Sequence, residues 1–72
     1  MDLELLEAKI DRGETLRVTY KYPSDRPGSP YATRTDRLLD VERERERLFV
    51  SFRGEKPVWI EKHEVIGIES SI

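Results

Sequence analysis

TLRVTYKY, residues 15–22, is the stretch that decides the fold of this chain. Its apolar and aromatic residues, at positions 16, 18, 20 and 22, alternate with polar ones. Successive side chains of a β-strand point to opposite faces, so this alternation predicts a half-buried strand with one apolar face. A short amphipathic stretch precedes it and further β-like segments follow. One helix and then only strands predicts a mainly-β fold: a five-stranded small barrel with one short N-terminal helix, formed by residues 1–72 as a single domain.

The segment before this strand has the pattern of a short helix. Leu3, Leu6 and Ile10 would share one stripe of that helix. Asp2 suits the N-cap, and Gly13 suits the left-handed position just past the C-terminus. A helix this short is unstable alone, so we expect it to dock on one end of the barrel.

Residues 33–47 allow two interpretations. As a strand, the segment places Leu39 and Val41 on one face; as a helix, it would be capped by Asp36. We favour the strand, because threonines open the segment and a β-rich run follows it. Residues 42–47 alternate Glu and Arg, which we interpret as a solvated hairpin tip whose charges pair with one another.

Three further strands are expected after that tip, over residues 48–52, 58–60 and 65–68. If Val50 and Ile60 point into the core, the alternation turns Phe49 and Trp59 outward. Two outward aromatic side chains on so small a barrel need a partner: the helix, a second subunit or a ligand. A chain this short buries only about 60% of its unfolded surface, so we expect a homodimer or larger homo-oligomer.

Composition limits the class of protein. The 72 residues include no cysteine, so no disulfide or thiolate metal site can form. Thirteen basic and fifteen acidic residues give a formal net charge of −2, so any basic surface must be local. Asn and Gln are also absent and 39% of the residues are charged, a thermophile-like composition. No apolar run approaches the ~20 residues of a membrane span and the N-terminus is acidic, so we expect a cytoplasmic protein that does not enter the membrane.

Residues suited to catalysis are few. His63 is the only histidine, which is too few for a metal site, and no cysteine or second histidine could act with it. The serines lie in no nucleophile-elbow context, and the dispersed glycines form no phosphate-cradling loop. We therefore expect a protein that is not an enzyme and that needs no metal and no cofactor.

Cations and aromatic residues are interleaved along the predicted strands and at the bend before the last one. Cations hold phosphates and aromatic rings stack on bases, so the mixture suits single-stranded nucleic acid or a nucleotide-like anion. The candidate ligand-binding residues are Arg17, Tyr31, Arg34, Arg37, Trp59, Lys62 and His63.

A purely structural interpretation of the same residues stays open. In it, Tyr20 and Tyr22 belong to the core, and Trp59 packs under the helix. The cations would then pair with nearby carboxylates, those of Glu55, Glu61 and Glu64.

Nearly the whole chain resembles the WYL domains of bacterial transcription regulators. The likeness lies in Leu5-Leu6-Glu7-Ala8-Lys9-Ile10, Leu16-Arg17-Val18-Thr19-Tyr20, Arg47-Leu48-Phe49-Val50-Ser51-Phe52 and Val65-Ile66-Gly67-Ile68-Glu69. WYL domains are Sm-like, SH3-like small barrels with a leading helix and a first strand that ends in tyrosine. The resemblance implies that fold, with basic ligand contacts at Arg34, Arg37 and Lys62. Glu64 stands where the family usually has arginine, so those contacts transfer only in part.

Lys62-His63, followed by Val65 and Ile68, is similar to a signature of the bacterial Sm-like RNA chaperone. In that family the Lys-His pair lines a ring pore and contacts uridines. Both resemblances imply one small barrel. From the interleaved cations and aromatics together with the WYL-like framework, we expect a stand-alone regulatory module that binds nucleic acid or a nucleotide-like anion in transcriptional or RNA regulation. The alternative is a protein–protein interaction module, which would bind the transcription machinery through an open sheet edge and the exposed Phe49 and Trp59.

Overall fold

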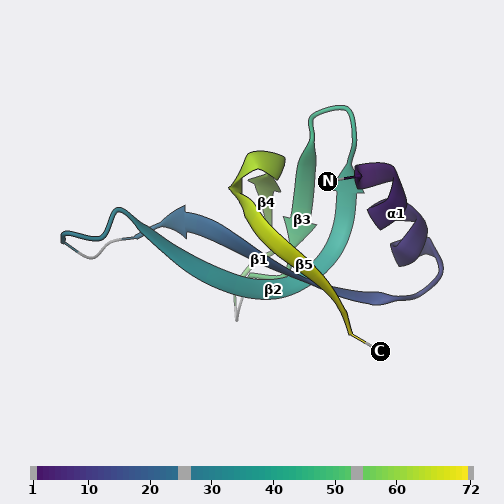
Figure 1. The fold of residues 1–72 in the computed structure, drawn as a ribbon, viewed down its shortest axis with the longest axis horizontal. Helices are drawn as coiled ribbons and strands as arrows, with labels where there is room; N and C mark the ends of the chain where they lie inside the picture. Colours follow the sequence, from purple (N-terminus) through teal and green to yellow (C-terminus); the bar gives the residue numbers. More distant parts are fainter. Residues whose placement is uncertain (1, 25–26, 53–54, 72) are drawn as a thin grey trace.

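The structure, a computed structural model, describes residues 2–24, 27–52 and 55–71 (Figure 1). Its elements in chain order are α1 (Leu3–Asp11), β1 (Thr15–Pro23), β2 (Tyr31–Glu42), β3 (Arg47–Val50), β4 (Val58–Glu61), the 3-10 turn η1 (Lys62–Glu64) and β5 (Val65–Ser71). The five strands form one antiparallel sheet in the order β4-β3-β2-β1-β5. The predicted mainly-β fold, with one N-terminal helix and five strands, is confirmed.

The ambiguous segment, residues 33–47, is extended, as the threonines at its start predicted. β2 runs to Glu42, a turn follows over residues 43–46, and β3 begins at Arg47. The turn ends at Glu46, whose φ of 51° lies in the left-handed region. A two-residue hairpin turn favours Gly or Asn, and the tip has neither, so a longer connection forms.

The sheet is strongly bent but not closed into a barrel, so the prediction of a closed barrel is wrong. β2 curves through the bend, pairing with β1 along its first half and with β3 along its second (Figure 1). β4 and β5 are the two edges, and among the described residues no pairing joins them. Closure needs strands whose lengths and stagger match around the ring. β3 and β4 hold four residues each, against nine in β1 and twelve in β2.

The core lies on one face of the bent sheet. Leu16, Val18 and Tyr20 of β1 are buried, with exposed Arg17 between the first two, so the alternation that predicted this strand is confirmed. The remaining core side chains come from α1, β2, β3 and β4: Leu3, Leu6, Leu38, Val41, Leu48, Val50 and Ile60.

The N-terminal helix forms where its stripe and caps predict it. The Leu5 N–H donates to Asp2 Oδ1 at 3.2 Å, and Gly13 has a φ of 83° just past the helix. Leu3 and Leu6 are buried, and α1 packs against β2. The helix therefore docks on the bent sheet, since there is no closed barrel whose end it could cover.

Candidate functional site

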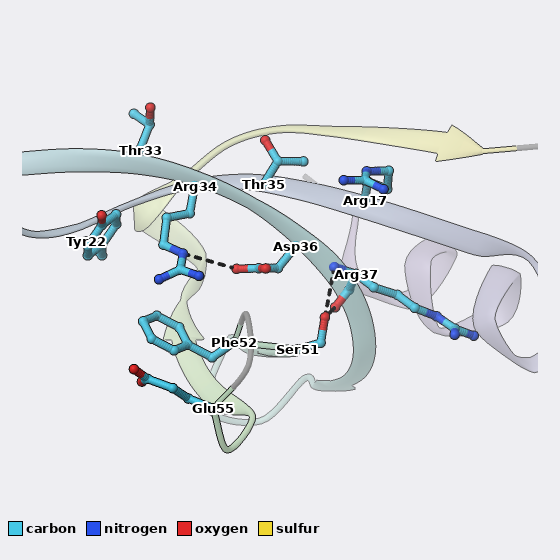
Figure 2. A pocket seen from close by; sticks show the side chains of 10 residues that line it. All are labelled: Arg17, Tyr22, Thr33, Arg34, Thr35, Asp36, Arg37, Ser51, Phe52 and Glu55. Atoms are coloured by element: carbon cyan, nitrogen blue, oxygen red, sulfur yellow. Dashed lines mark hydrogen bonds and ion pairs between the residues drawn. The ribbon is translucent and has the colours of Figure 1, made fainter.

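A groove of about 1020 Å³ lies along the first half of β2 (Figure 2). Three of the predicted ligand-binding residues, Arg17, Arg34 and Arg37, are among those that line it. The full lining is Arg17, Tyr22, Thr33, Arg34, Thr35, Asp36, Arg37, Ser51, Phe52 and Glu55. The groove is thus where the structure brings the largest part of the predicted site together.

The groove exists because β2 is longer than the strand that should cover it. β2 pairs with β1 from Tyr31 to Arg37, but it pairs with β3 only from Leu38 onward. The chain after β3, including Ser51 and Phe52, faces this uncovered half of β2 across the groove. Among the described residues, no strand therefore pairs with this edge of β2 before Leu38.

The backbone at the end of the ladder shows which polar groups this free edge presents. The Arg37 N–H donates to Ser51 Oγ at 3.2 Å, and the Ser51 N–H donates to the Arg37 carbonyl at 3.0 Å. Both backbone groups of Arg37 therefore point away from β1. Strand residues two apart repeat this orientation. The N–H and C=O of Thr35 and Thr33 therefore also point away from β1, in the plane of the sheet. No described residue bonds to them.

The outward face of β1 and β2 carries a pair of like charges. Arg17 faces Arg37 and Thr19 faces Thr35 in the register. These are non-hydrogen-bonded pairs, the kind in which facing side chains lie closest, and the two threonine hydroxyls are 2.8 Å apart. Both arginines are exposed, and neither forms an ion pair with a described residue, although Glu69 faces Arg17 from β5.

Arg34 points the other way, to the inner face of the sheet. Its guanidinium carbon lies 3.9 Å from the centre of the Phe52 ring and 5.5 Å from that of Tyr22. Its Nε is 3.7 Å from Asp36 Oδ2. Packing against two rings and a carboxylate holds the guanidinium in place, so Arg34 is a fixed part of the groove wall.

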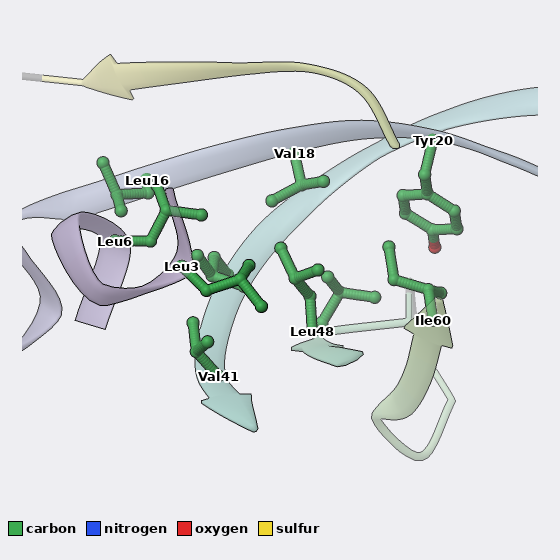
Figure 3. Close-up of a cluster of buried hydrophobic side chains, with 10 residues drawn as sticks. Leu3, Leu6, Leu16, Val18, Tyr20, Val41, Leu48 and Ile60 are labelled. Carbon is green, nitrogen blue, oxygen red and sulfur yellow. The ribbon is translucent and has the colours of Figure 1, made fainter. Parts of the chain in front are cut away.

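Asp36 is the charged residue that anchors this wall, and sequence reasoning did not identify it as one. Its side chain is buried, and the Tyr20 hydroxyl donates to its Oδ2 at 2.5 Å. Tyr20 itself is completely buried, at the end of the core opposite the helix residues Leu3 and Leu6 (Figure 3). Burial, the hydrogen bond to Asp36 and the charge of that carboxylate raise the pKa of Tyr20 far above its usual range. A signal did exist, because alternation along a strand places Asp36 on the same face as Leu38.

The two predicted aromatic contacts lie outside the groove. Tyr31 is exposed, with 64% of its surface accessible, at the start of β2. Trp59 lies on β4 and is 38% exposed. The centre of its ring lies 4.7 Å from the centre of the Phe49 ring and 4.9 Å from the guanidinium carbon of Arg47. Phe49 and Arg47 thus partly cover Trp59, in place of the helix that the purely structural interpretation puts there.

Lys62 and His63 belong to a second, smaller pocket of about 470 Å³, whose other lining residues are Arg45, Glu46, Glu61 and Val65. Lys62 Nζ lies 3.9 Å from a carboxylate oxygen of Glu46, and the Lys62 N–H donates to the Glu46 carbonyl at 2.9 Å. The seven predicted residues therefore fall into a groove group, this pocket, and two separate aromatics. The sequence could not show this division, because it depends on which face and which end of the sheet each strand presents.

The prediction that the charges of the alternating hairpin tip pair with one another is confirmed only in part. Glu42 pairs with Arg45 at 3.4 Å and with Arg47 at 3.0 Å. Arg43 instead reaches the helix, 3.6 Å from Glu7 and 4.0 Å from Glu4. The expectation that Glu55, Glu61 and Glu64 neutralise the cations is wrong, since the ion pairs of the described residues use other carboxylates.

Comparison with protein-family models, with curated proteins and with solved structures finds no match for this chain. Among the described residues, no group of three or more His, Cys, Asp or Glu side chains is placed to hold a metal ion. The described helices include none long and apolar enough to cross a membrane.

Proposed function

We propose that this protein is a stand-alone regulatory module that binds single-stranded nucleic acid or a nucleotide-like anion, rather than an enzyme. The proposal includes an Sm-like, WYL-like ancestry for the bent sheet. A leading helix followed by five antiparallel strands is the element order that the sequence resemblance implies. The observation that carries the binding function is the facing pair Arg17 and Arg37, exposed and without a counter-ion among the described residues.

Two facing arginines lower the stability of the sheet unless an anion binds over them. Like charges directly opposite each other on neighbouring strands destabilise a sheet. Facing residues of a non-hydrogen-bonded pair have Cα atoms only about 4.5 Å apart. A phosphate over this pair would accept hydrogen bonds from both guanidinium groups and offset their repulsion. The pair is therefore suited to a phosphate group.

The same outward face extends the site along the two strands. Beyond the pair of Arg17 and Arg37, the next pairs on the outward face are Thr19 with Thr35 and then Lys21 with Thr33. Tyr31 faces Pro23 at the end of the ladder. With residues rising about 3.4 Å each, the strip from Arg37 to Tyr31 spans about 20 Å. A single strand lying along it would meet three cations for its phosphates and one exposed ring on which a base can stack.

Fluorescence anisotropy with labelled ten-nucleotide single-stranded DNA and RNA at low salt tests this function. The double change Arg17→Ala and Arg37→Ala should abolish most of the binding. Because each lost phosphate contact on a single strand lowers the slope of log K against log salt by about 0.7, the slope should fall by about 1.4. Arg12→Ala is the matched control, since Arg12 is exposed but already paired with Glu14 at 2.8 Å.

Three results would contradict the proposal. They are no binding at tens of micromolar, binding that salt does not weaken, and a double variant that binds as tightly as the Arg12→Ala control. A protein that binds mononucleotides but not oligonucleotides would narrow the function to the nucleotide-like anion, since only the arginine pair and not the whole strip would then be in use.

A further inference from the structure

We propose that the free edge of β2 binds an extended acidic peptide of a partner protein by strand addition, in the groove between that edge and Phe52. This goes beyond the nucleic-acid function, which uses the outward face of the sheet. The two sites overlap, because some residues of the outward face also line the groove: Arg17, Thr33, Thr35 and Arg37.

The backbone of the edge has the pattern that an added strand needs. Thr33 and Thr35 each point an N–H and a C=O away from β1, in the plane of the sheet. The two residues lie about 6.8 Å apart along the strand. β3 and Ser51 already occupy the continuation of this edge, at Leu38 and Arg37. A peptide entering the groove would extend the same ladder by two more residues of β2. Such edges template the pairing of another chain unless a charge, a proline or a bulge blocks them.

The groove wall selects the side chains of that peptide. Alternate side chains of an added strand would face the inner side of the sheet, beside Phe52 and Arg34, and the intervening ones would lie on the outward side next to Arg37. Phe52 offers an apolar surface, whereas Arg37 has no ion pair within the described residues. The groove therefore favours a peptide that alternates apolar with acidic residues.

A polypeptide fits this edge better than a nucleic acid does. Phosphate oxygens accept hydrogen bonds but do not donate them, so a backbone phosphate leaves the carbonyls of Thr33 and Thr35 unmatched. A peptide strand supplies both N–H donors and C=O acceptors at the required spacing. The charge of the groove also favours an acidic occupant. Arg34 and the Tyr20 hydroxyl already satisfy Asp36, which leaves two further arginines in the lining against Glu55.

The experiment uses capped, fluorescent eight-residue peptides that alternate Glu with Val, and measures their binding by anisotropy. A Lys-for-Glu version tests charge. A version N-methylated on every second residue, made in both registers, tests backbone pairing without altering the protein. The Glu–Val peptide should bind at least tenfold more tightly than either control, and its binding should slow the exchange of the Thr33 and Thr35 amide protons.

Protein variants test the same edge from the other side. Thr35→Pro and Thr33→Pro each remove a N–H that points away from β1, so the β1–β2 ladder keeps its hydrogen bonds. Each should weaken binding of the Glu–Val peptide about tenfold relative to the valine variant of the same residue. Thr35→Val and Thr33→Val, which change only the side chains, are the matched controls and should retain binding.

Equal binding of the N-methylated and unmodified peptides would overturn the proposal, even if a proline variant failed to fold. Failure of the Glu–Val peptide to bind at millimolar concentration would do the same. Protection of the Thr33 and Thr35 amides by oligo(dT), and not by the peptide, would reassign the groove to nucleic acid.

Discussion

Tyr20→Phe is the substitution that tests the inner wall of the groove. It removes one hydroxyl and leaves the shape of a completely buried ring. The buried carboxylate of Asp36 then loses its 2.5 Å hydrogen bond and, among the described residues, keeps Arg34 as its partner, with Nε 3.7 Å away. We expect a clear loss of stability, because a buried charge that loses a donor retains most of its desolvation cost.

The size of the loss follows from the kind of bond. Hydrogen bonds to charged groups contribute about 1.5–3 kcal/mol, and no cavity is opened by the change, so we expect a loss of about 2 kcal/mol in the free energy of unfolding. For a domain of this length that corresponds to a fall of roughly 8–16 °C in Tm. Urea titration followed by far-UV circular dichroism measures the free energy, and a thermal scan measures the Tm.

Tyr22→Phe is the matched control on the same strand face. Tyr22 is half-buried, and its hydroxyl has no hydrogen-bond partner among the described residues, so its removal should cost less than about 0.5 kcal/mol. If Tyr20→Phe cost no more than Tyr22→Phe, the Tyr20–Asp36 bond would contribute nothing. A double-mutant cycle with Asp36→Asn should give a coupling energy above about 0.5 kcal/mol, because a neutral amide accepts the Tyr20 hydrogen bond less strongly than a carboxylate does.

Two further predictions concern pH and assembly. The folded state holds the Tyr20 proton more tightly than the unfolded chain does, so Tyr20 stabilises the fold fully below pH ~10 and progressively loses this contribution as the pH rises further. Urea midpoints between pH 8 and 11.5 should therefore fall less for Tyr20→Phe than for the wild type, and parallel curves would refute the role of this group. The sheet also has two edges, β4 and β5, and exposes Ile66 at 54% and Trp59 at 38%, so we expect a homodimer or larger assembly at micromolar concentration. Light scattering that gives the 8.5 kDa mass of one chain would contradict this.

The alternation in residues 15–22 was enough to predict β1 and most of the core on that strand. It succeeded because one face of β1 is buried and the other is exposed, so local polarity reports the tertiary environment directly. The helix was predictable for a similar reason: Asp2, the Leu3–Leu6 stripe and Gly13 are local signals, and each has its expected role.

Barrel closure was not predictable from the same signals. Closure depends on how far each strand pairs with its neighbours. The sequence pattern of β3 and β4 predicts where these strands lie, but it does not predict how many residues of each pair with the next strand. The grouping of the candidate site failed for a related reason. Alternation alone puts Arg34 and Arg37 on opposite faces of β2, but only the register between β1 and β2 places Arg37 directly opposite Arg17.

The features that open the sheet are also those that build the candidate site. At Arg37 the backbone N–H donates a hydrogen bond to the hydroxyl of Ser51. In a longer β3, a backbone carbonyl would take the place of this hydroxyl. One residue later Phe52 packs its ring on Arg34, which lies across the groove on β2. Asp36 and Tyr20 hold Arg34 from behind, so the ring has a fixed surface to meet. The ladder between β2 and β3 therefore ends where a side chain replaces the backbone as partner. Beyond that point, the edge of β2 that faces away from β1 lies beside a cationic and aromatic wall, which is why we propose it as a binding edge.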